Sequence, residues 1–447
     1  MMQLPSFVTQ FMDTFAKHGY KIYAVGGTVR GLLMKHEVND WDFTTSARPE
    51  QIQKLFEHHF YNNQFGTVGV PIDVNGNELV FEVTTFRKEG KYSNARHPDE
   101  VQWAETIEED LSRRDFTINA LAFDGKELID PFGGQDDIEK RVVRAVGKPD
   151  ERFGEDALRL LRAVRQATQL GFMIEEKTHA SIVANAQNIS RISGERIREE
   201  LFKILASPHA ADGILLLKNT GLLHHILPEV DNAFGVEQKS PHRHHVFDVG
   251  THLVESLRHC PSSEVITRFS TLIHDIGKVQ THRKDPKTHI ITFYNHEVVG
   301  EKQAEKIADR LRLSKDQKQK LVTLVRHHQF SVSEKQSDKA IRRFVKNVGK
   351  EWIQDMLDLR TGDRLGSGAK ETSWRTELFK KRLVEVQKKP FTVHDLTITG
   401  HDVMEELSMK PGPQIGTILE QLFEEVVEGR VKNEKKALLE QMKMISS

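Results

Sequence analysis

The chain has 447 residues, of which 38% are hydrophobic and 29% are charged, and its mean hydropathy is −0.50. No apolar run approaches the ~20 residues that span a bilayer, so we expect a soluble protein of several domains without a membrane partner. The single cysteine, Cys260, cannot form an internal disulfide, and the first residues lack the basic and apolar segments of a secretory signal, which favours a cytoplasmic location.

Charge is distributed unevenly along the chain. Residues 1–140 contain 14 Lys and Arg against 23 Asp and Glu, whereas residues 141–447 contain 50 against 42. An acidic N-terminal region suits metal binding, and a mildly basic remainder suits contacts with a phosphate backbone. The alternative for any single lysine is an ordinary solvated surface charge.

Short β-rich segments are predicted at residues 21–25, 41–44, 79–85 and 120–123, with helical stretches between them. From about residue 150 helical periodicity dominates, and helices are expected at 156–169, 194–205, 252–259 and 298–312. The turn Pro411-Gly412-Pro413 and an amphipathic run at 417–428 indicate a separate helical tail. We therefore expect an α+β protein, with a small α/β head followed by an all-α remainder.

The run Val25-Gly26-Gly27-Thr28-Val29-Arg30 follows the first predicted strand. Gly26 and Gly27 allow a tight turn whose backbone N–H groups can face a phosphate. Asp40 and Asp42 are spaced i, i+2 on the next strand, so they point to one face and can hold divalent cations together. Glu82 is either a third carboxylate near the metals or part of a structural ion pair. A phosphate seat beside metal-binding carboxylates predicts nucleotidyl transfer, with Asp40 and Asp42 as catalytic ligands of Mg²⁺.

Further motifs follow in order at residues 65–68, 82–87, 92–98, 108–120, 155–159 and 193–198. Together with the glycine turn and Asp40-Trp41-Asp42, this series resembles the class II tRNA nucleotidyltransferases, which are the CCA-adding enzymes and the bacterial poly(A) polymerases. The resemblance covers about the first 205 residues. The chain departs from the family at Gly31 and Asn94, where the family usually has Asp.

The resemblance implies roles for several polar side chains. Nucleotide contacts are expected from Gly26, Gly27, Arg30, Arg113, Arg114, Asp115, Asn119, Asp156, Arg159, Arg162 and Arg165. Adjacent arginines offer forked donors to phosphate oxygens, and an asparagine can reach a ribose hydroxyl. Residues 87–98 resemble the mobile loop that helps the family change from C to A.

The motif Glu155-Asp156-Ala157-Leu158-Arg159 can be read chemically. On a helix, Asp156 and Arg159 would lie side by side at i, i+3. A carboxylate accepts a hydrogen bond from the exocyclic amino group of cytosine or adenine, and the guanidinium donates to the acceptor beside it. Uracil and guanine present a carbonyl oxygen instead, so this pair predicts selection of C and A. The alternative is an exposed surface ion pair.

The middle of the chain carries a second pattern, with nine of the 22 histidines in residues 242–296. His252, the doublet His274-Asp275 followed by Ile276-Gly277-Lys278, and the distal Asp363 resemble the HD-domain metal phosphohydrolases. His296 and His327 would complete a binuclear centre, and His245 is an alternative to His252. Imidazole and carboxylate ligands favour a transition metal (Mn, Co, Ni or Fe) over Mg²⁺. The site is either an active phosphatase or cyclic phosphodiesterase, or a retained scaffold.

These patterns predict four domains. They are a nucleotidyltransferase head at 1–140, a helical neck and body at 141–240, an HD domain at 241–370 and a tail at 371–447. The tail resembles the RNA-contacting end of long bacterial CCA-adding enzymes, and the alternative is a helical hairpin that only packs on the body. The sequence does not indicate an oligomeric state.

The function that the resemblance implies is template-independent addition of C, C and A to tRNA 3′ ends from CTP and ATP. The alternatives are a poly(A) polymerase, an enzyme that adds only CC or only A, and an RNA-binding protein with a degenerate head. Residues 62–67 lack the basic Gly-Arg-Arg-Phe-like run that is usual in the bacterial poly(A) polymerases, which favours CCA addition.

Overall fold

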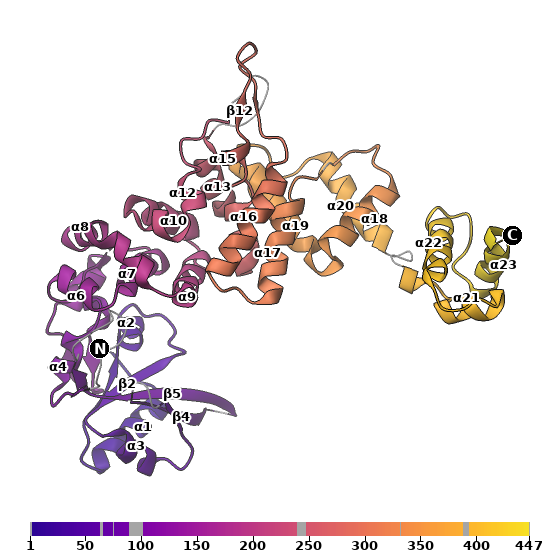
Figure 1. Ribbon diagram of the computed structural model, residues 1–447. Coiled ribbons are helices and arrows are strands. Elements are labelled where there is room, and N and C mark those ends of the chain that lie inside the picture. The colour runs from indigo at the N-terminus through magenta and orange to yellow at the C-terminus, as the bar shows by residue number, and fades with distance from the viewer. Residues whose placement is uncertain are drawn as a thin grey trace. The chain divides into compact units, whose positions relative to one another are not determined.

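A computed structural model describes residues 2–62, 66–74, 76–88, 102–238, 247–330, 332–387 and 393–446 (Figure 1). Asn94, His245, residues 63–65 of the run 62–67 and residues 89–98 of the run 87–98 lie outside the described residues. The chain forms two compact units, one of residues 1–236 with 305–315 and one of residues 237–304 with 316–447. The finer division into four domains stays a prediction. Within the described ranges, no helix combines the length and apolar character needed to cross a membrane.

A mixed seven-stranded sheet organises the head, with strand order β3-β4-β5-β2-β1-β8-β9. Strand β2 pairs with β5 in parallel, and the other neighbouring pairs in this sheet are antiparallel. The strands are β1 (Ile22–Val25), β2 (Trp41–Thr45), β3 (Phe60–Asn62), β4 (Thr67–Val74), β5 (Asn77–Thr85), β8 (Ala122–Phe123) and β9 (Leu128–Ile129). The four strands predicted from sequence are confirmed, each within two residues at its ends.

The core of the head is aromatic and covers one face of the sheet. Helix α1 (Ser6–Lys17) contributes Phe11, whose ring packs 5.1 Å from that of Phe43 and 4.9 Å from that of Phe81, measured between centroids. Figure 1 shows α1 and α3 (Pro49–Leu55) against this face. Because side chains alternate along a strand, burying Trp41 and Phe43 turns Asp42 to the opposite face. The packing of Trp41 and Phe43 in the core therefore directs the carboxylate of Asp42 away from the core.

The rest of this unit is mainly helical. A short parallel pair, β10 (Val142–Val143) with β11 (Met173–Ile174), lies between helices. The central helix α7 (Leu158–Leu170) packs against α9 (Gly194–Leu205) and α10 (Ala210–Asn219). The remaining helices are α2 (Gly27–Leu33), α4 (Ile107–Ser112), α5 (Gly134–Glu139), α6 (Pro149–Glu155), α8 (Glu176–Asn185), α11 (Leu222–Ile226) and α12 (Pro228–Asp231).

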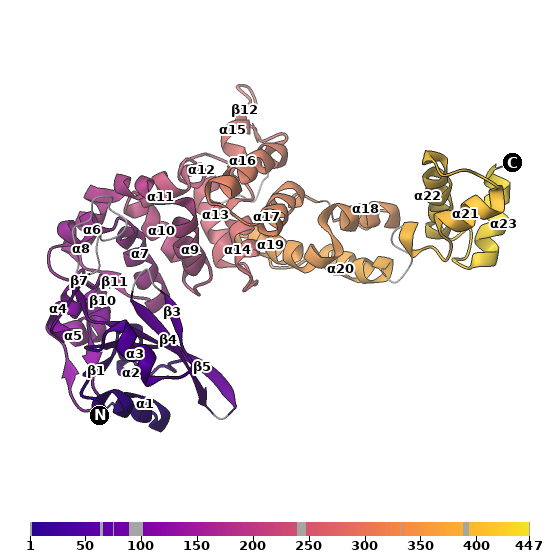
Figure 2. The same cartoon turned by 60° about the horizontal axis from the view of Figure 1, so that its bottom comes forward.

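The second unit contains helices and one small hairpin, β12 (Arg283–Lys284) with β13 (Ile291–Thr292), which Figure 2 shows beside helix α15 (Lys278–Thr281). Helices α13 (Val249–Arg258), α14 (Val265–Ile273) and α19 (Ile353–Gly366) pack on one another. Gly277 is required where the chain meets helix α16 (His296–Arg310), since a Cβ there would lie 2.0 Å from the carbonyl oxygen of His296. The other helices are α17 (Lys315–His327), α18 (Asp338–Val348) and α20 (Trp374–Gln387). Helix α16 begins in this unit, and residues 305–315, from the end of α16 to the first residue of α17, belong to the first unit.

The C-terminal helices α21 (Gly400–Leu407), α22 (Pro413–Val427) and α23 (Lys435–Ser446) have a hydrophobic cluster of their own. Leu422, Leu438 and Met442 are fully buried in it. Thr399 caps α21, with Asp402 completing a capping box. The expected α+β fold class is confirmed by the mixed sheet of the head and the helices that follow it.

Candidate active site and metal centre

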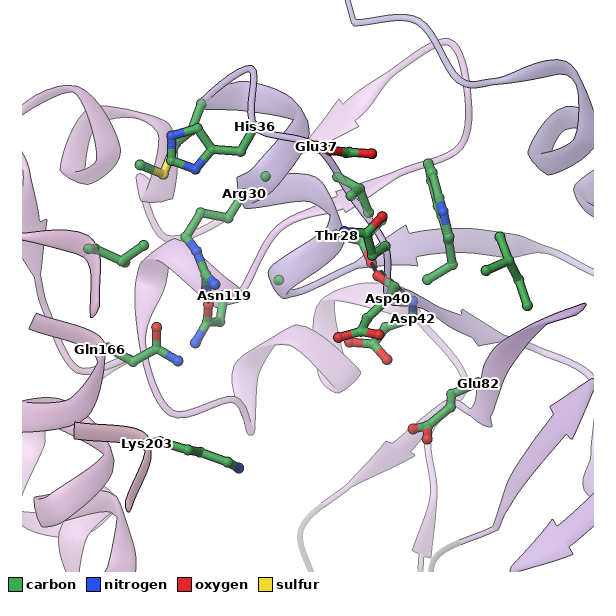
Figure 3. Close-up of a pocket in the computed structure, with 18 of the residues that line it drawn as sticks. Thr28, Arg30, His36, Glu37, Asp40, Asp42, Glu82, Asn119, Gln166 and Lys203 are labelled. Carbon is green, nitrogen blue, oxygen red and sulfur yellow. Dashed lines mark hydrogen bonds between the residues drawn. The ribbon is translucent and has the colours of Figure 1, made fainter. Parts of the chain in front are cut away.

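Three carboxylates gather at one edge of a cavity of about 880 Å³ in the head-containing unit. Asp42 lies on β2, Asp40 just before it, and Glu82 is the residue opposite Asp42 on β5. Figure 3 shows the carboxylates of Asp40 and Asp42 beside each other and Glu82 facing the same space. Burial, reinforced by Glu82 and Asp40, raises the pKa of Asp42 to about 6. A cation would relieve this repulsion, and an all-oxygen donor set suits Mg²⁺.

Thr28 on helix α2 fixes this group, although the sequence did not single it out. Its hydroxyl donates to the backbone oxygen of Asp40 at 3.0 Å and accepts from the backbone N–H of Asp42 at the same distance. The side chain is 1% exposed. Thr28 therefore ties the glycine turn to the segment that bears both carboxylates. The only sequence signal for it is its place directly after the two glycines.

The glycine turn is strained in a way that excludes other residues. Gly26 has φ 64° and ψ −127°, and a Cβ there would lie 3.0 Å from Nη1 of Arg114. Arg30, one turn further on, donates to the side-chain oxygen of Asn119. Asn119 in turn donates to Asp115 at 3.3 Å. Arg30 and Asn119 both line the cavity, and their contact with a nucleotide stays a prediction.

Arg113 and Arg114 make different contacts. Nη2 of Arg113 lies 2.7 Å and Nη2 of Arg114 lies 3.2 Å from the carboxylate of Asp110, which is fully buried. Neither arginine lines the carboxylate cavity, whereas Arg113 lines a smaller cavity of about 340 Å³ with Arg152 and Glu155. Asp110 was not selected from the sequence, where it reads as one acid among several in residues 105–110.

The wall of the cavity opposite the carboxylates is cationic. Arg162 and Arg165 lie on α7 and Lys203 on α9, and all three line the cavity. Nε of Arg162 donates to Asp115 at 2.8 Å, and Nε of Arg165 lies 2.9 Å from Glu200. Burial alone would raise the pKa of Asp115, but Arg162 and Arg159 hold it well below its usual range. Figure 3 shows Lys203 and Gln166 on the side of the cavity away from Asp40 and Asp42.

The expected helical pairing of Asp156 with Arg159 is wrong in its geometry. Asp156 lies between α6 and α7 with φ −142° and ψ 110°, so it is not on the helix that carries Arg159. Its carboxylate accepts from Arg196 of α9 at 2.7 Å. Arg159 donates to Glu155 and to the backbone oxygens of Arg152 and Arg113. Neither Asp156 nor Arg159 lines the carboxylate cavity. The i, i+3 rule fails because α7 begins only at Leu158.

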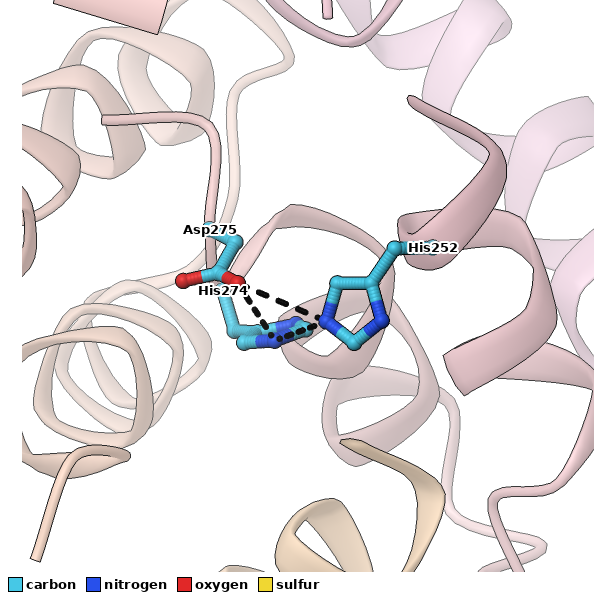
Figure 4. A group of neighbouring side chains, drawn as sticks. All are labelled: His252, His274 and Asp275. Carbon is cyan, nitrogen blue, oxygen red and sulfur yellow. Dashed lines mark hydrogen bonds and ion pairs between the residues drawn. The ribbon is translucent and has the colours of Figure 1, made fainter. Parts of the chain in front are cut away.

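A second group of polar side chains lies in the other unit. The ligand atoms of three residues lie close together, as Figure 4 shows. His252 lies on α13, and His274 and Asp275 directly follow α14. Nε2 of His252 lies 3.3 Å from Nε2 of His274, and both nitrogens lie 3.4 Å from Oδ2 of Asp275. Asp363 of α19 adds Oδ1 at 3.4 Å from His252 and 3.7 Å from His274. All four residues were predicted together from sequence.

The other oxygen of Asp275 belongs to a second triplet. Its Oδ1 lies 3.1 Å from Nε2 of His296 and 3.3 Å from Nε2 of His328. Among the described residues, the predicted ligand His327 is not part of either triplet, and the buried His328 takes its place. The selection of His327 is thus corrected by one position, because the neighbouring ring is the one that faces inward.

Backbone carbonyls orient three of these rings. Nδ1 of His274, His296 and His328 lies 2.8, 2.9 and 2.7 Å from the oxygens of Thr271, Phe293 and Val325, so each Nε2 is directed at the centre. Burial alone would lower the pKa of His274, but Asp275 and Asp363 raise it to about 10. Buried imidazoles whose Nε2 atoms face one another around a carboxylate fit a transition metal.

Three family models match the chain. The model described as the poly A polymerase head domain matches residues 22–144. The model described as "Probable RNA and SrmB- binding site of polymerase A" matches residues 171–234. A third, for domain 2 of tRNA nucleotidyltransferase, matches residues 284–442.

Individual relatives agree with these models. The CCA-adding enzyme of Geobacillus kaustophilus is 46% identical over 212 residues, which are 47% of this chain, so the chain spans about half (52%) of that relative's length. A crystal structure of the Bacillus stearothermophilus CCA-adding enzyme in complex with CTP matches with a TM-score of 0.75 and 27% identity, covering 98% of this chain and 97% of that one. The CCA-adding enzyme of Levilactobacillus brevis is 33% identical over 432 residues, 96% of this chain and 95% of the relative. Because that alignment covers nearly all of both chains, the chain belongs to the CCA-adding enzyme family.

Proposed function

We propose that the chain adds C, C and A to the 3′ end of tRNA from CTP and ATP without a nucleic-acid template. The observation that carries this proposal is that Asp40 and Asp42 line one cavity together with Arg162 and Arg165 of α7. The similar Bacillus stearothermophilus enzyme is in complex with CTP, and the matching models are named for RNA binding and for tRNA nucleotidyltransferase. These names support CTP and tRNA as substrates in this proposal.

Different residues of the cavity would bind the metal ions and the triphosphate. Asp40 and Asp42 would hold Mg²⁺, which lowers the pKa of an attacking 3′-hydroxyl and neutralises the departing pyrophosphate. Arg162 and Arg165 offer forked donors to the triphosphate oxygens. Arg30, which donates to Asn119, adds a further cation to the lining of the cavity. Thr28 keeps the two carboxylates at a fixed separation from the glycine turn.

Base choice would come from Asp156 and Arg159. The carboxylate of Asp156 can accept from the amino group of cytosine or adenine, and Arg159 can donate to the neighbouring acceptor. Arg196 adds a constraint on this pair, since it already binds Oδ2 of Asp156 at 2.7 Å. That contact holds the carboxylate in one orientation, so the protein presents a fixed acceptor to the incoming base.

The direct experiment incubates the protein with a tRNA that ends at the discriminator base, with CTP, ATP and Mg²⁺, and sequences the 3′ ends. We expect C, C and A in that order. Long adenosine tracts would indicate a poly(A) polymerase, and products that stop at CC, or gain only A, would indicate a partial enzyme. Binding of the tRNA with no incorporation would indicate an RNA-binding protein. Asp42→Asn tests the carboxylate, with Asp136→Asn, an acid on the surface of α5, as the matched control.

We further propose a metal-dependent phosphohydrolase at the histidine–aspartate group. The specific observation is that each oxygen of Asp275 faces two imidazoles, which places it between two prospective ions. Two such ions (Mn, Co, Ni or Fe) would bind and activate a hydroxide for attack on a phosphate ester. The test measures phosphate release from p-nitrophenyl phosphate and hydrolysis of 2′,3′-cyclic nucleotides with each metal. His274→Ala should abolish both activities and leave CCA addition intact. Inactive wild-type protein with every metal would mean a scaffold.

A further inference from the structure

The histidine–aspartate group opens into a cavity of about 460 Å³. One of the side chains that line this cavity is the cationic Arg360, which is suited to binding an anionic ligand. Arg360 lies one turn before Asp363 on α19, and its Nη1 donates to that carboxylate at 3.0 Å. In the described part of the chain, this is the one hydrogen bond its guanidinium makes, and the ring of Phe330 lies 5.6 Å away. Arg360 is therefore oriented, with further donors left for a ligand that reaches the cavity.

Lys278, the other cation of the cavity, is already engaged. Its Nζ lies 2.5 Å from Asp275 and 3.0 Å from the side-chain oxygen of Gln238. Its side chain is almost completely buried. Lys278 therefore balances the charge of Asp275, and the contact with an incoming anion falls to Arg360. A guanidinium is well suited to this because it can donate two parallel hydrogen bonds to a phosphate.

The mouth of the cavity carries an exposed aromatic ring. Residues 292–295, which begin at the last residue of strand β13, line the cavity, and Phe293 packs inward at 8% exposure. Tyr294 points outward and is 77% exposed, the largest fraction among the exposed large hydrophobic side chains of the described residues. Such a ring, next to a phosphate-sized anion site, offers a face on which a nucleobase can stack.

The hairpin that leads to Tyr294 is basic and exposed. Residues 283–290 are all exposed, and they include Arg283, Lys284 and Lys287. Its turn is ordered by Asp285, whose carboxylate accepts from the backbone N–H groups of Lys287 and Thr288 at 2.9 and 2.7 Å. Figures 1 and 2 both show the hairpin projecting from the helices next to α15. An ordered basic projection with an aromatic at its base is typical of binding to a single nucleic-acid strand.

We propose that this cavity takes the phosphate-bearing end of a single RNA strand. Arg360 contacts the terminal phosphate, Tyr294 stacks on the terminal base, and Arg283 and Lys287 contact the phosphates behind it. The inference rests on the proposed phosphohydrolase function and names its substrate class. A free nucleotide would use Arg360 and Tyr294 alone and leave the hairpin without a role, so the basic hairpin favours a strand.

The first test isolates the terminal phosphate. An eight-nucleotide RNA with a fluorophore at one end is bound with and without a phosphate at the other end, for both polarities, in EDTA and again with Mn²⁺. RNA contacts elsewhere on the protein affect both probes equally, so the ratio of the two dissociation constants reports the phosphate. We expect one phosphorylated end to bind about tenfold more tightly to the wild type. Arg360→Gln should bring the ratio to about one, and Arg360→Lys should give an intermediate value. A wild-type ratio of one for both polarities and both conditions overturns the proposal.

The second test separates a strand from a free nucleotide. Combined Arg283→Ala and Lys287→Ala should weaken the phosphorylated RNA and lower the salt dependence of its binding by about 1.4 in log–log slope. Lys302→Ala, an exposed lysine of α16, is the matched control. Tyr294→Ala should weaken binding and Tyr294→Phe should restore it.

The last comparison decides between the sources of the phosphate. If adenosine monophosphate competes as well as the phosphorylated RNA, or if the hairpin variants bind RNA like the wild type, the strand proposal is wrong. Phosphate release from p-nitrophenyl phosphate is measured on the same preparations. If the wild type releases no phosphate, the proposed phosphohydrolase function is wrong. The ratios of dissociation constants would still test the RNA site in that case.

Discussion

Replacing His328 by alanine should remove one of two metal ions from the histidine–aspartate group. Its Nε2 lies 3.3 Å from both Oδ1 of Asp275 and Nε2 of His296, so the variant leaves that triplet with two ligands. The other triplet, of His252, His274 and Asp275, keeps all its ligands. Loss of even an outer hydrogen-bond partner costs about 10- to 100-fold in metal affinity, or roughly 1.4–2.7 kcal/mol, and loss of a direct ligand should cost at least that.

His327 provides a closely matched control, because it is the adjacent residue and loses the same atoms on substitution. It is half-buried, and burial together with Arg326 and His328 lowers its pKa, but it does not belong to either triplet. After dialysis against Mn²⁺ or Co²⁺, metal analysis should find about two ions per chain in the wild type and in His327→Ala. It should find about one in His328→Ala.

The reasoning would be refuted by the reverse pattern, in which His327→Ala loses an ion and His328→Ala retains both. Circular dichroism of both variants checks that the helices remain folded. His328→Gln preserves more of the buried volume than alanine does, so it separates loss of a ligand from a packing defect. All three variants should retain CCA addition with Mg²⁺.

Three further predictions concern the head-containing unit. Asp40→Ala or Asp42→Ala should abolish nucleotide addition while tRNA binding by gel shift stays near wild type; incorporation close to normal would refute the carboxylate assignment. Asp156→Ala, and Arg159→Ala likewise, should admit UTP or GTP in single-nucleotide incorporation assays, whereas slower but strict C and A addition would mean a structural pair. Because the folded-state pKa of Asp115 is depressed, its stabilisation is present above about pH 4 and is lost as the pH falls below it. The melting temperature of the wild type should therefore drop more between pH 5 and pH 3 than that of Asp115→Asn, and parallel drops would show that the carboxylate carries no folding free energy.

The parts of the site that depend on local geometry could be predicted from sequence. Asp40 and Asp42 are set two apart at a strand, and strand periodicity alone puts them on one face. The doublet His274-Asp275 could be predicted from its resemblance to the HD-domain metal phosphohydrolases, because its flanking pattern is short and contiguous. Glu82 required knowledge of which strands pair, so its role stayed open until the parallel register of β2 with β5 was known.

The failures came from helix ends. Asp156 was placed on a helix that starts two residues later, at Leu158, and this changed its partner from Arg159 to Arg196. His327 is the last residue of α17, where neighbouring positions differ by about 100° around the axis. The buried positions of that helix point to the correct ring, because His328 lies seven, four and three residues after Leu321, Leu324 and Val325.

The pairing of Asp42 with Glu82 makes the hydrogen-bond ladder of the sheet a determinant of chemistry. Both residues sit at one rung between β2 and β5, and β5 is pinned on its other side by eight consecutive pairs with β4. A shift of β5 by a single residue would exchange its two faces and remove Glu82 from the cavity, even with every side chain conserved. Insertions or deletions inside β4 or β5 should thus silence the enzyme while it remains folded. The relative positions of Asp42 and Glu82 therefore depend on the pairing of strands most of whose side chains do not line the cavity.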